Sequence, residues 1–358
     1  MLLYKKIIFV TIVFFVLIST VQISCYNATK ASRTRYAYRY IYYPIPGIKP
    51  DFNLANIENP TPITGYSQGR ERQPVVSPDG KYVAFVNQPQ SKIPGVPFTS
   101  NIKVFEVENP NRWYDVTETE AAQSVSGPSW IRNNRILYTM FDPATELFYN
   151  IYFIDFPRIR PDGYAVLGRE HRIWQVGMDI RSSAVSPDGK KCIICADVAI
   201  YKKGKIDIFR RQPHLENPML FEFDMDERTI KNIGSGFDPS FSPDGKKIVY
   251  GKLVGDNSFI YVKNLQTGFD GPITHGDDAW DWMPCWSPGS DEIAFASLRG
   301  SDWNIYKIDE DGNNMIQLTI SKGTEWDPCW APGGYIYFSF YTGIDWDIWR
   351  VQLKKPKY

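Results

Sequence analysis

The sequence is poor in histidine and cysteine and carries no net charge. Its 358 residues include three histidines and five cysteines, and 40 Lys plus Arg balance 40 Asp plus Glu. A balanced chain has no overall field for nucleic acid or anionic membrane, so any charge effect must be local. So few cysteines exclude a disulfide-rich scaffold, and three scattered histidines argue against a histidine-based metal centre. We expect no cofactor, no structural metal and no nucleic-acid partner.

What is abundant favours β-structure. Aromatic residues make up 15% of the chain, and glycine and proline number 26 each. This mixture is typical of many short strands joined by tight turns. The chain is longer than most single domains, but β-propellers reach this length as one unit.

The first 24 residues have the pattern of an export signal. Lys5 and Lys6 precede an almost uncharged apolar run over 7–23, and Ser24-Cys25 ends that run. This ending resembles the lipobox of bacterial lipoproteins, although Gln22 stands where that motif has leucine. Three interpretations stay open: lipidation of Cys25, ordinary cleavage nearby, or an uncleaved membrane anchor. All three predict an exported protein, either periplasmic or membrane-anchored and facing away from the cytoplasm.

One short phrase, clearest as Ser-Pro-Asp-Gly, recurs along the chain and carries the fold prediction. Successive copies place their serine, or the residue in its position, at Ser77, Ile131, Ser186, Ser242, Ser287 and Ala331. The last three copies are 45 and 44 residues apart, the length of a four-stranded propeller blade. The first four are 54 to 56 residues apart, so we expect their additional residues in loops.

The ends of the chain predict how the ring closes. The last copy has only three strands, the third over 347–353, whereas Pro62-Ile63-Thr64 before the first copy has the form of a fourth strand. Pairing these two segments would remove the exposed sheet edges. We therefore predict an all-β fold, a six-bladed β-propeller closed by an N-terminal strand that completes the last blade. The expected organisation is a signal or anchor over 1–24, a tether over 25–59, which includes an Arg/Tyr-rich stretch at 33–43, and the propeller over 60–354.

The repeat itself carries a family resemblance. Asp-Pro-x-Trp/Phe-Ser-Pro-Asp-Gly-Lys followed by an apolar strand resembles the repeat of the TolB carboxy-terminal propeller and its WD-like relatives, over roughly residues 60–353. The resemblance covers the propeller part alone, because only about 35 residues separate Cys25 from the closing strand and TolB has an α/β domain there. In that family one face of the propeller binds a protein partner, which the resemblance implies for this chain.

The predicted binding surface is the channel-mouth face. We define it as the face that bears the loops from strand four of one blade to strand one of the next, together with the loops between strands two and three. Tryptophan and carboxylates, a composition favoured at binding hot spots, are concentrated in these loops. The residues expected to contact a partner are Trp280, Asp281, Trp282, Glu325, Trp326, Asp327, Asp238, Arg70 and Arg72. The alternative role of the same side chains is to brace neighbouring blades through hydrogen bonds.

We expect a non-enzymatic, monomeric scaffold that binds a protein partner in the cell envelope. The prolyl oligopeptidases attach a hydrolase domain to a propeller, and no residues remain here to build one. The alternative is a glycan- or metal-binding propeller with hydrolase or lyase activity, in which Asp281, Asp327 and Asp238 converge in the channel. Cys285 and Cys329 occupy equivalent positions in the repeat, and we expect them to be buried free thiols.

Overall fold

The computed structural model describes residues 50–64, 69–89, 99–119, 123–141, 150–156, 158–159, 165–166, 170–174, 179–197, 201–202, 205–206, 218–343 and 345–354. Side chains are described for these residues apart from 158–159, 165–166, 170–174, 179, 181, 197, 201–202 and 205–206. The predicted signal segment, Cys25 and the segment 33–43 lie outside the described residues. The compact unit that contains the strands runs over Pro46–Tyr358.

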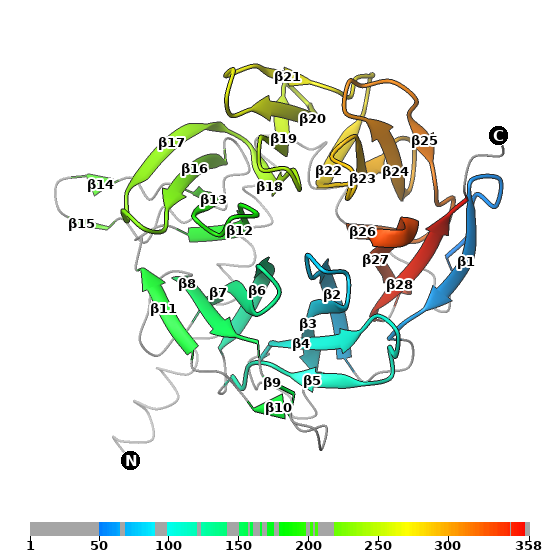
Figure 1. Ribbon diagram of the computed structural model, residues 1–358. Coiled ribbons are helices and arrows are strands. Elements are labelled where there is room, and N and C mark those ends of the chain that lie inside the picture. Colours follow the sequence, from blue (N-terminus) through cyan, green and yellow to red (C-terminus); the bar gives the residue numbers. More distant parts are fainter. Residues whose placement is uncertain are drawn as a thin grey trace, which may run out of the picture. The chain divides into compact units, whose positions relative to one another are not determined.

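The fold is a β-propeller, as predicted: antiparallel sheets of four strands succeed one another around a centre (Figure 1). The first blade pairs β2 (Gly69–Val76), β3 (Tyr82–Pro89), β4 (Asn101–Glu106) and β5 (Trp113–Asp115). The second pairs β6 (Ser124–Ile131), β7 (Arg135–Phe141), β8 (Asn150–Asp155) and β11 (Glu170–Trp174). The next pairs β12 (Asp179–Val185), β13 (Lys191–Asp197), β16 (Met219–Asp224) and β17 (Ile230–Ser235).

The later blades have the same order. One pairs β18 (Phe237–Phe241), β19 (Lys247–Val254), β20 (Asn257–Asn264) and β21 (Asp270–Pro272), and another pairs β22 (Trp280–Trp286), β23 (Glu292–Leu298), β24 (Trp303–Asp309) and β25 (Ile316–Gln317). The last contains β26 (Thr324–Ala331), β27 (Tyr335–Tyr341) and β28 (Trp346–Leu353). Two small ribbons, β9 (Arg158–Ile159) with β10 (Ala165–Val166) and β14 (Tyr201–Lys202) with β15 (Lys205–Ile206), lie in the longer early repeats.

The fourth strand of the last blade is β1 (Ile57–Pro62), which pairs antiparallel with β28, with Pro62 opposite Trp349. Beyond it, the N–H of Ile63 donates to the carbonyl of Ile348 at 2.8 Å, and the N–H of Ile348 donates to Thr64 Oγ1 at 2.7 Å. Buried apolar side chains of the first and last blades also pack against each other, and there the rings of Phe105 and Tyr337 lie 6.0 Å apart. Segments from the two ends of the chain thus share one sheet and one core.

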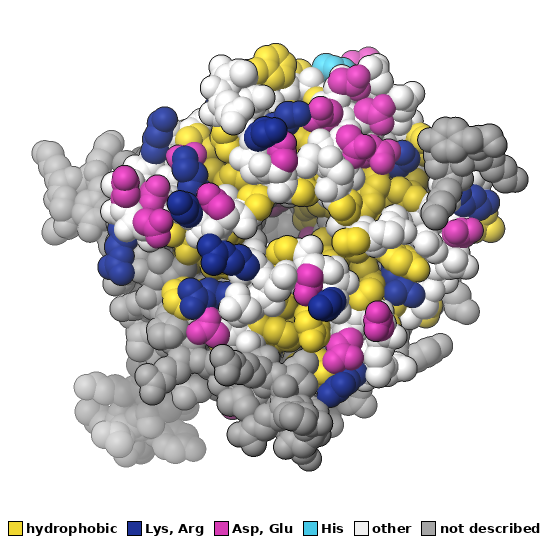
Figure 2. All heavy atoms as spheres, viewed as in Figure 1, with side chains coloured by type: hydrophobic (Ala, Val, Ile, Leu, Met, Phe, Trp, Pro, Cys, Tyr) yellow, Lys and Arg dark blue, Asp and Glu magenta, His cyan; other side chains and the backbone are white. Residues whose placement is uncertain are grey.

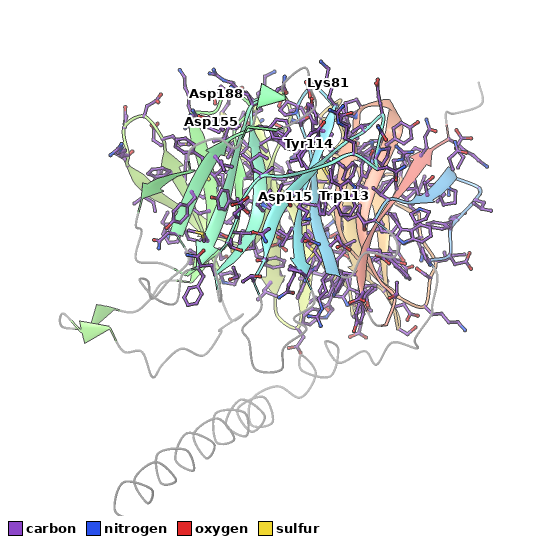
Figure 3. All side chains as sticks on the ribbon, turned by 90° about the horizontal axis from the view of Figure 1, so that it is seen from below. Lys81, Trp113, Tyr114, Asp115, Asp155 and Asp188 are labelled. Carbon is purple, nitrogen blue, oxygen red and sulfur yellow. The ribbon has the colours of Figure 1, made fainter. Side chains whose placement is uncertain are left out.

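The Ser-Pro-Asp-Gly phrase forms the turn between the first two strands of a blade. In the first copy the N–H of Gly80 donates to the carbonyl of Ser77 at 2.8 Å, and Gly80 has the positive φ of 73° that glycine accepts without strain. The hydroxyl of Ser77 donates to Asp79 Oδ1 at 2.7 Å and accepts the N–H of Tyr82 at 3.0 Å. These turns gather at one end of the blades, where Lys81 and Asp188 are seen in Figure 3. The motif is therefore structural.

The inner strands β2, β6, β18, β22 and β26 contain a bulge at the same point of the repeat, where pairing with the second strand shifts register. In β12 the shift falls earlier, between Ile180 and Ser182. The residue just before the repeat's proline has positive φ at Gln73, Gly127, Asp238, Met283 and Asp327, with values from 49° to 59°. Only one of these is a glycine, so four side chains are held in a conformation that L-residues seldom adopt. Within the described residues, no helix is both long and apolar enough to cross a membrane.

Candidate functional site

The structure separates the predicted contact residues into two groups. Trp280, Asp281, Trp282 and Glu325 are buried, with 3%, 0%, 8% and 0% of their surface exposed. The expectation that these four side chains face solvent or a partner is therefore corrected. Arg70 is exposed, and the half-buried members are Trp326, Asp327, Asp238 and Arg72.

Buried and half-buried tryptophans form a continuous row of contacting rings. Trp282 lies 5.1 Å from Trp303, Trp303 lies 5.9 Å from Trp326, and Trp326 stacks on Trp346 at 5.1 Å. The indole N–H of Trp282 donates to Ser258 Oγ at 2.9 Å, which satisfies the polar end of a buried ring. The row joins neighbouring blades beneath their loops, so its inner members brace the propeller and its outer end, at Trp346, is partly exposed.

Asp281 is the acidic member of a buried ion pair. Arg299 Nη2 lies 2.7 Å from Asp281 Oδ2, and the hydroxyl of Ser297 donates to Asp281 Oδ1 at 2.5 Å. Burial raises the pKa of Asp281, an effect that the guanidinium of Arg299 and the hydroxyl of Ser297 oppose. Asp281 does not line the central cavity. The channel set of the alternative function, Asp281, Asp327 and Asp238, is therefore reduced to Asp327 and Asp238. Among the described residues, no group of three or more His, Cys, Asp or Glu side chains could hold a metal ion.

The exposed end of the tryptophan row carries an arginine from the first blade. The guanidinium carbon of Arg72 lies 4.5 Å from the ring centre of Trp346 and 5.1 Å from that of Trp326. Arg72 Nη2 also lies 3.3 Å from Asp327 Oδ2. Its side chain remains 31% exposed, whereas that of Asp327 is 9% exposed. Arg72, Trp326, Asp327 and Trp346, which we call the seam cluster, thus combine a planar cation, two indole faces and a carboxylate.

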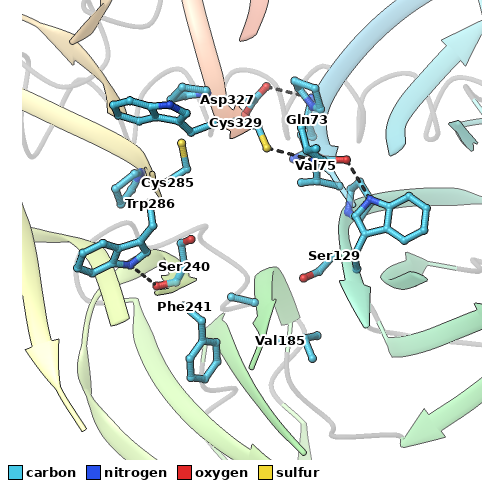
Figure 4. A pocket seen from close by; sticks show the side chains of 18 of the residues that line it. Gln73, Val75, Ser129, Val185, Ser240, Phe241, Cys285, Trp286, Asp327 and Cys329 are labelled. Atoms are coloured by element: carbon cyan, nitrogen blue, oxygen red, sulfur yellow. Dashed lines mark hydrogen bonds between the residues drawn. The ribbon is translucent and has the colours of Figure 1, made fainter. Parts of the chain in front are cut away.

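The bulge residues connect the seam cluster to the central channel. Asp327 Oδ2 accepts the backbone N–H of Gln73 at 3.3 Å and the hydroxyl of Ser339 at 2.9 Å (Figure 4). Gln73 Oε1 accepts the N–H of Gly127 at 2.9 Å, and the N–H of Asp327 lies 3.4 Å from the sulfur of Met283. Each of these three side chains accepts from the bulge of the next blade, so hydrogen bonds link the bulges of four successive blades along the channel.

A cavity of about 500 Å3 follows this channel, and the inner strands of all the blades line it. Prolines of the repeat supply much of its wall, together with tryptophans such as Trp286 and the bulge residues Asp238 and Asp327. On the turn face the opening is bordered largely by apolar and uncharged side chains, while both signs of charge are scattered farther out (Figure 2). The volume is within the range of ligand sites, and the lining is mainly apolar with few polar groups.

The channel thiols are Cys285 and Cys329, which line the cavity in adjacent blades (Figure 4). All four cysteines in the described part of the chain are free, as predicted for Cys285 and Cys329, but these two are half-buried and not fully buried as expected. Burial raises the pKa of Cys329 to about 11, and burial together with repulsion from Cys329 raises the pKa of Cys285 well above its usual range. The N–H of Val76 donates to the sulfur of Cys329 at 3.2 Å. These are packed thiols that stay protonated at neutral pH.

Sequence reasoning missed four residues of this region: Gln73, Met283, Arg299 and Ser339. The first two could have been found, because each directly precedes the proline of its repeat copy, as Asp238 and Asp327 do. Arg299 and Ser339 carry no such signal.

The sequence also contains one Gly-x-Ser-x-Gly spacing, Gly65-Tyr66-Ser67-Gln68-Gly69, the spacing of a hydrolase nucleophile elbow. Residues 65–68 lie outside the described residues. A nucleophile elbow requires a helix after the serine, whereas strand β2 begins at Gly69. The structural context of the motif in hydrolases is therefore not met at this position.

Comparison with known proteins agrees with this architecture. Residues 226–355 match the family model of the TolB beta propeller domain. TolB from Acinetobacter baumannii has a similar structure, with 17% identity, a TM-score of 0.53 and coverage of 80% of this chain and 65% of that chain. The match to the TolB beta propeller domain thus covers the last three blades, and the chain spans 65% of the length of that TolB.

Enzymes share the fold as well. A gluconolactonase from Xanthomonas campestris matches at 12% identity with a TM-score of 0.54, covering 88% of this chain and 99% of that one. The β-propeller domain of the Trilobed protease from Pyrococcus furiosus matches at 12% identity with a TM-score of 0.50, covering 81% and 96%. At such identities the likeness concerns the fold alone, so function must be argued from the site.

Proposed function

We propose that the protein is an exported, envelope-associated binding scaffold without catalytic activity, and that it engages a protein partner through the channel-mouth face. The observation that carries this proposal is the seam cluster. The guanidinium of Arg72 lies over two indole rings beside the channel and is still partly exposed. Arginine and tryptophan are the residues most enriched at protein-binding hot spots.

The local energetics favour a preformed docking point. Contact with Trp346 and the ion pair with Asp327 hold Arg72 in one orientation, so little side-chain entropy is lost when a partner binds. The exposed part of the guanidinium can donate hydrogen bonds to carbonyl or carboxylate oxygens of a partner. The adjoining cavity, lined by proline and tryptophan, suits an apolar side chain or a short peptide segment from the same partner.

The test is site-specific photocrosslinking in intact cells, with the full chain. One probe replaces Asp277, which is exposed in the loop before β22 on the channel-mouth face, and the other replaces Asp244, which is exposed in a turn of the opposite face. We expect a discrete protein adduct from position 277 and none from position 244. Arg72→Ala should reduce the adduct yield at position 277 several-fold, whereas Arg228→Ala, at an exposed arginine in the β16–β17 turn, should leave it unchanged.

Equal adduct yields from the two faces would contradict the proposal. So would an Arg72→Ala protein that is folded, by circular dichroism, and keeps the full yield at position 277.

A further inference from the structure

Glu325 is a buried carboxylate that lacks the hydrogen bonds such a group needs. It is 0% exposed, and neither carboxylate oxygen has a hydrogen-bond partner among the described residues. The hydroxyl of Thr319 and the backbone N–H of Glu325 itself oppose the rise in its pKa, but the single proton of that hydroxyl also faces Asn304 Oδ1 at 3.4 Å, and burial outweighs both groups. A bare carboxylate is strongly disfavoured in such a site, so a proton or a cation must compensate it.

A second carboxylate lies beside the first. β24 and β26 meet in parallel where Trp303 is opposite Thr324, which places Asp302 and Glu325 on either side of this contact. Asp302 Oδ1 is buried and has no hydrogen-bond partner within the described residues, and the same is true of Ser321 Oγ. Burial, reinforced by repulsion from Asp302, raises the pKa of Glu325 well above its usual range. Glu325 and Asp302 thus bring two buried carboxylates to one contact between blades, and Ser321, four residues before Glu325, adds a buried hydroxyl without a partner among the described residues.

The neighbouring seam shows what is different here. There β20 and β22 meet in parallel where Ser258 is opposite Trp280, so Asn257 and Asp281 stand in the positions of Asp302 and Glu325. Of these two positions only Asp281 is acidic, and Arg299 forms an ion pair with it. By strand register, Phe340 and Thr342 occupy the places of Ser297 and Arg299 in the last blade. The seam at Glu325 therefore has one more acid and lacks the basic residue.

We propose that Glu325, Asp302 and Ser321 form a site for a divalent cation with the chemistry of calcium. All three groups supply oxygen, and two of them carry negative charge. No basic side chain offsets this charge at the position of Arg299, which Thr342 occupies here. Calcium takes carboxylate and other oxygen ligands in irregular arrangements, whereas magnesium demands a near-ideal octahedron. The ion would join the loop after β23 to the loop before β26 and so fix Trp303 and Trp326, which directly follow the two acids in sequence.

These two tryptophans provide the readout. Terbium(III) replaces calcium in oxygen sites and emits when a nearby excited indole transfers energy to it. We would titrate the purified full chain, in detergent and free of calcium, with terbium under tryptophan excitation. We expect saturable emission that calcium displaces at lower concentration than magnesium. Glu325→Gln and Asp302→Asn should each weaken apparent affinity by about tenfold or more, whereas the exposed Glu227→Gln should not change it.

Thermal unfolding gives a second measurement that does not depend on emission. Calcium should raise the Tm of the wild type and of Glu227→Gln, and should leave that of Glu325→Gln unchanged. Absence of saturable emission, or equal affinity in the wild type and both acid variants, would overturn the proposal. A wild-type Tm that responds to pH and not to calcium would overturn it as well, because the two carboxylates would then share a proton.

Discussion

The carboxylate of Asp327 accepts the backbone N–H of Gln73 at 3.3 Å, a hydrogen bond between the last blade and the first. The same oxygen accepts the hydroxyl of Ser339 and faces the guanidinium of Arg72. The side chain of Asp327 therefore links the last blade to the first blade and also belongs to the seam cluster on the channel-mouth face.

Loss of this carboxylate should destabilise the closure of the ring. We expect Asp327→Asn to lower the free energy of unfolding by about 1–3 kcal/mol, because buried donors lose a charged acceptor. Asp327→Ala should lower it by about 1 kcal/mol more, since φ is 53° at this position and asparagine tolerates such a value better than alanine. Urea unfolding followed by tryptophan fluorescence measures both values. Asp115→Asn, at an ion pair whose carboxylate is 64% exposed, is the control and should change stability by less than about 0.5 kcal/mol. Equal stability of the two Asp327 variants would contradict the role assigned to φ.

Removal of the cation beside Asp281 should cause a pH-dependent loss of stability. Arg299→Met leaves a buried carboxylate without its partner and should cost about 3–5 kcal/mol at neutral pH. Burial raises the pKa of Asp281, and a raised pKa in the folded state means that stability is greatest at low pH and falls as pH rises through that pKa. The Tm deficit of Arg299→Met should therefore be smaller at pH 5 than at pH 8. In the double variant Asp281→Asn/Arg299→Met, the Tm deficit should be the same at pH 5 and pH 8. A pH-dependent deficit in that variant would refute this explanation.

The repeat turns should contribute to acid unfolding. Hydrogen bonds from Ser186 to Asp188 and from Ser242 to Asp244 lower the pKa of each aspartate. A lowered pKa means that this stabilisation is present above the unfolded-state value of about 4 and is lost as pH falls through the folded-state value. Asp188→Asn/Asp244→Asn should thus flatten the dependence of Tm on pH below about pH 4. A double variant that keeps the wild-type slope would count against the turns as acid-sensitive elements.

The channel thiols should be unreactive in the folded protein. With a pKa of about 11, Cys329 has a thiolate fraction at pH 8 roughly a hundredfold below that of a thiol with a pKa of 9. We expect Ellman's reagent to react slowly with a Cys25→Ser chain until guanidinium unfolds it, whereupon four thiols should react at once. Rapid reaction of either channel thiol in native buffer would show that the cavity admits reagent and ionises the thiol.

The β-propeller and its turns were predictable because their signals are local. Pro-Asp-Gly sets φ over three consecutive residues, and the apolar run after each copy defines a strand whatever its neighbours are. The TolB-type repeat follows from the same residues and agrees with the family match over 226–355. The bulge residues of these inner strands could also have been predicted from the sequence, since Gln73 and Met283 precede a repeat proline just as Asp238 and Asp327 do.

The exposure of the tryptophan loops was not predictable from the sequence. In an isolated sheet, alternation would leave one face of β22 open, but in a propeller both faces of a blade are covered by neighbouring blades. Trp280 and Trp282 are therefore buried, although the sequence around them predicted an exposed loop.

The sequence alone determined the strands, the turns and the repeat, because each depends on residues that are neighbours in the chain. Only the tertiary structure decided that Asp281 meets an arginine while Glu325 meets a second acid, and that Arg72 lies over Trp346. Arg72 and Trp346 are far apart in sequence and come together through the pairing of β1 with β28 and the packing of the first blade on the last. Electrostatic and stacking energies depend on such distances, and no local pattern encodes them.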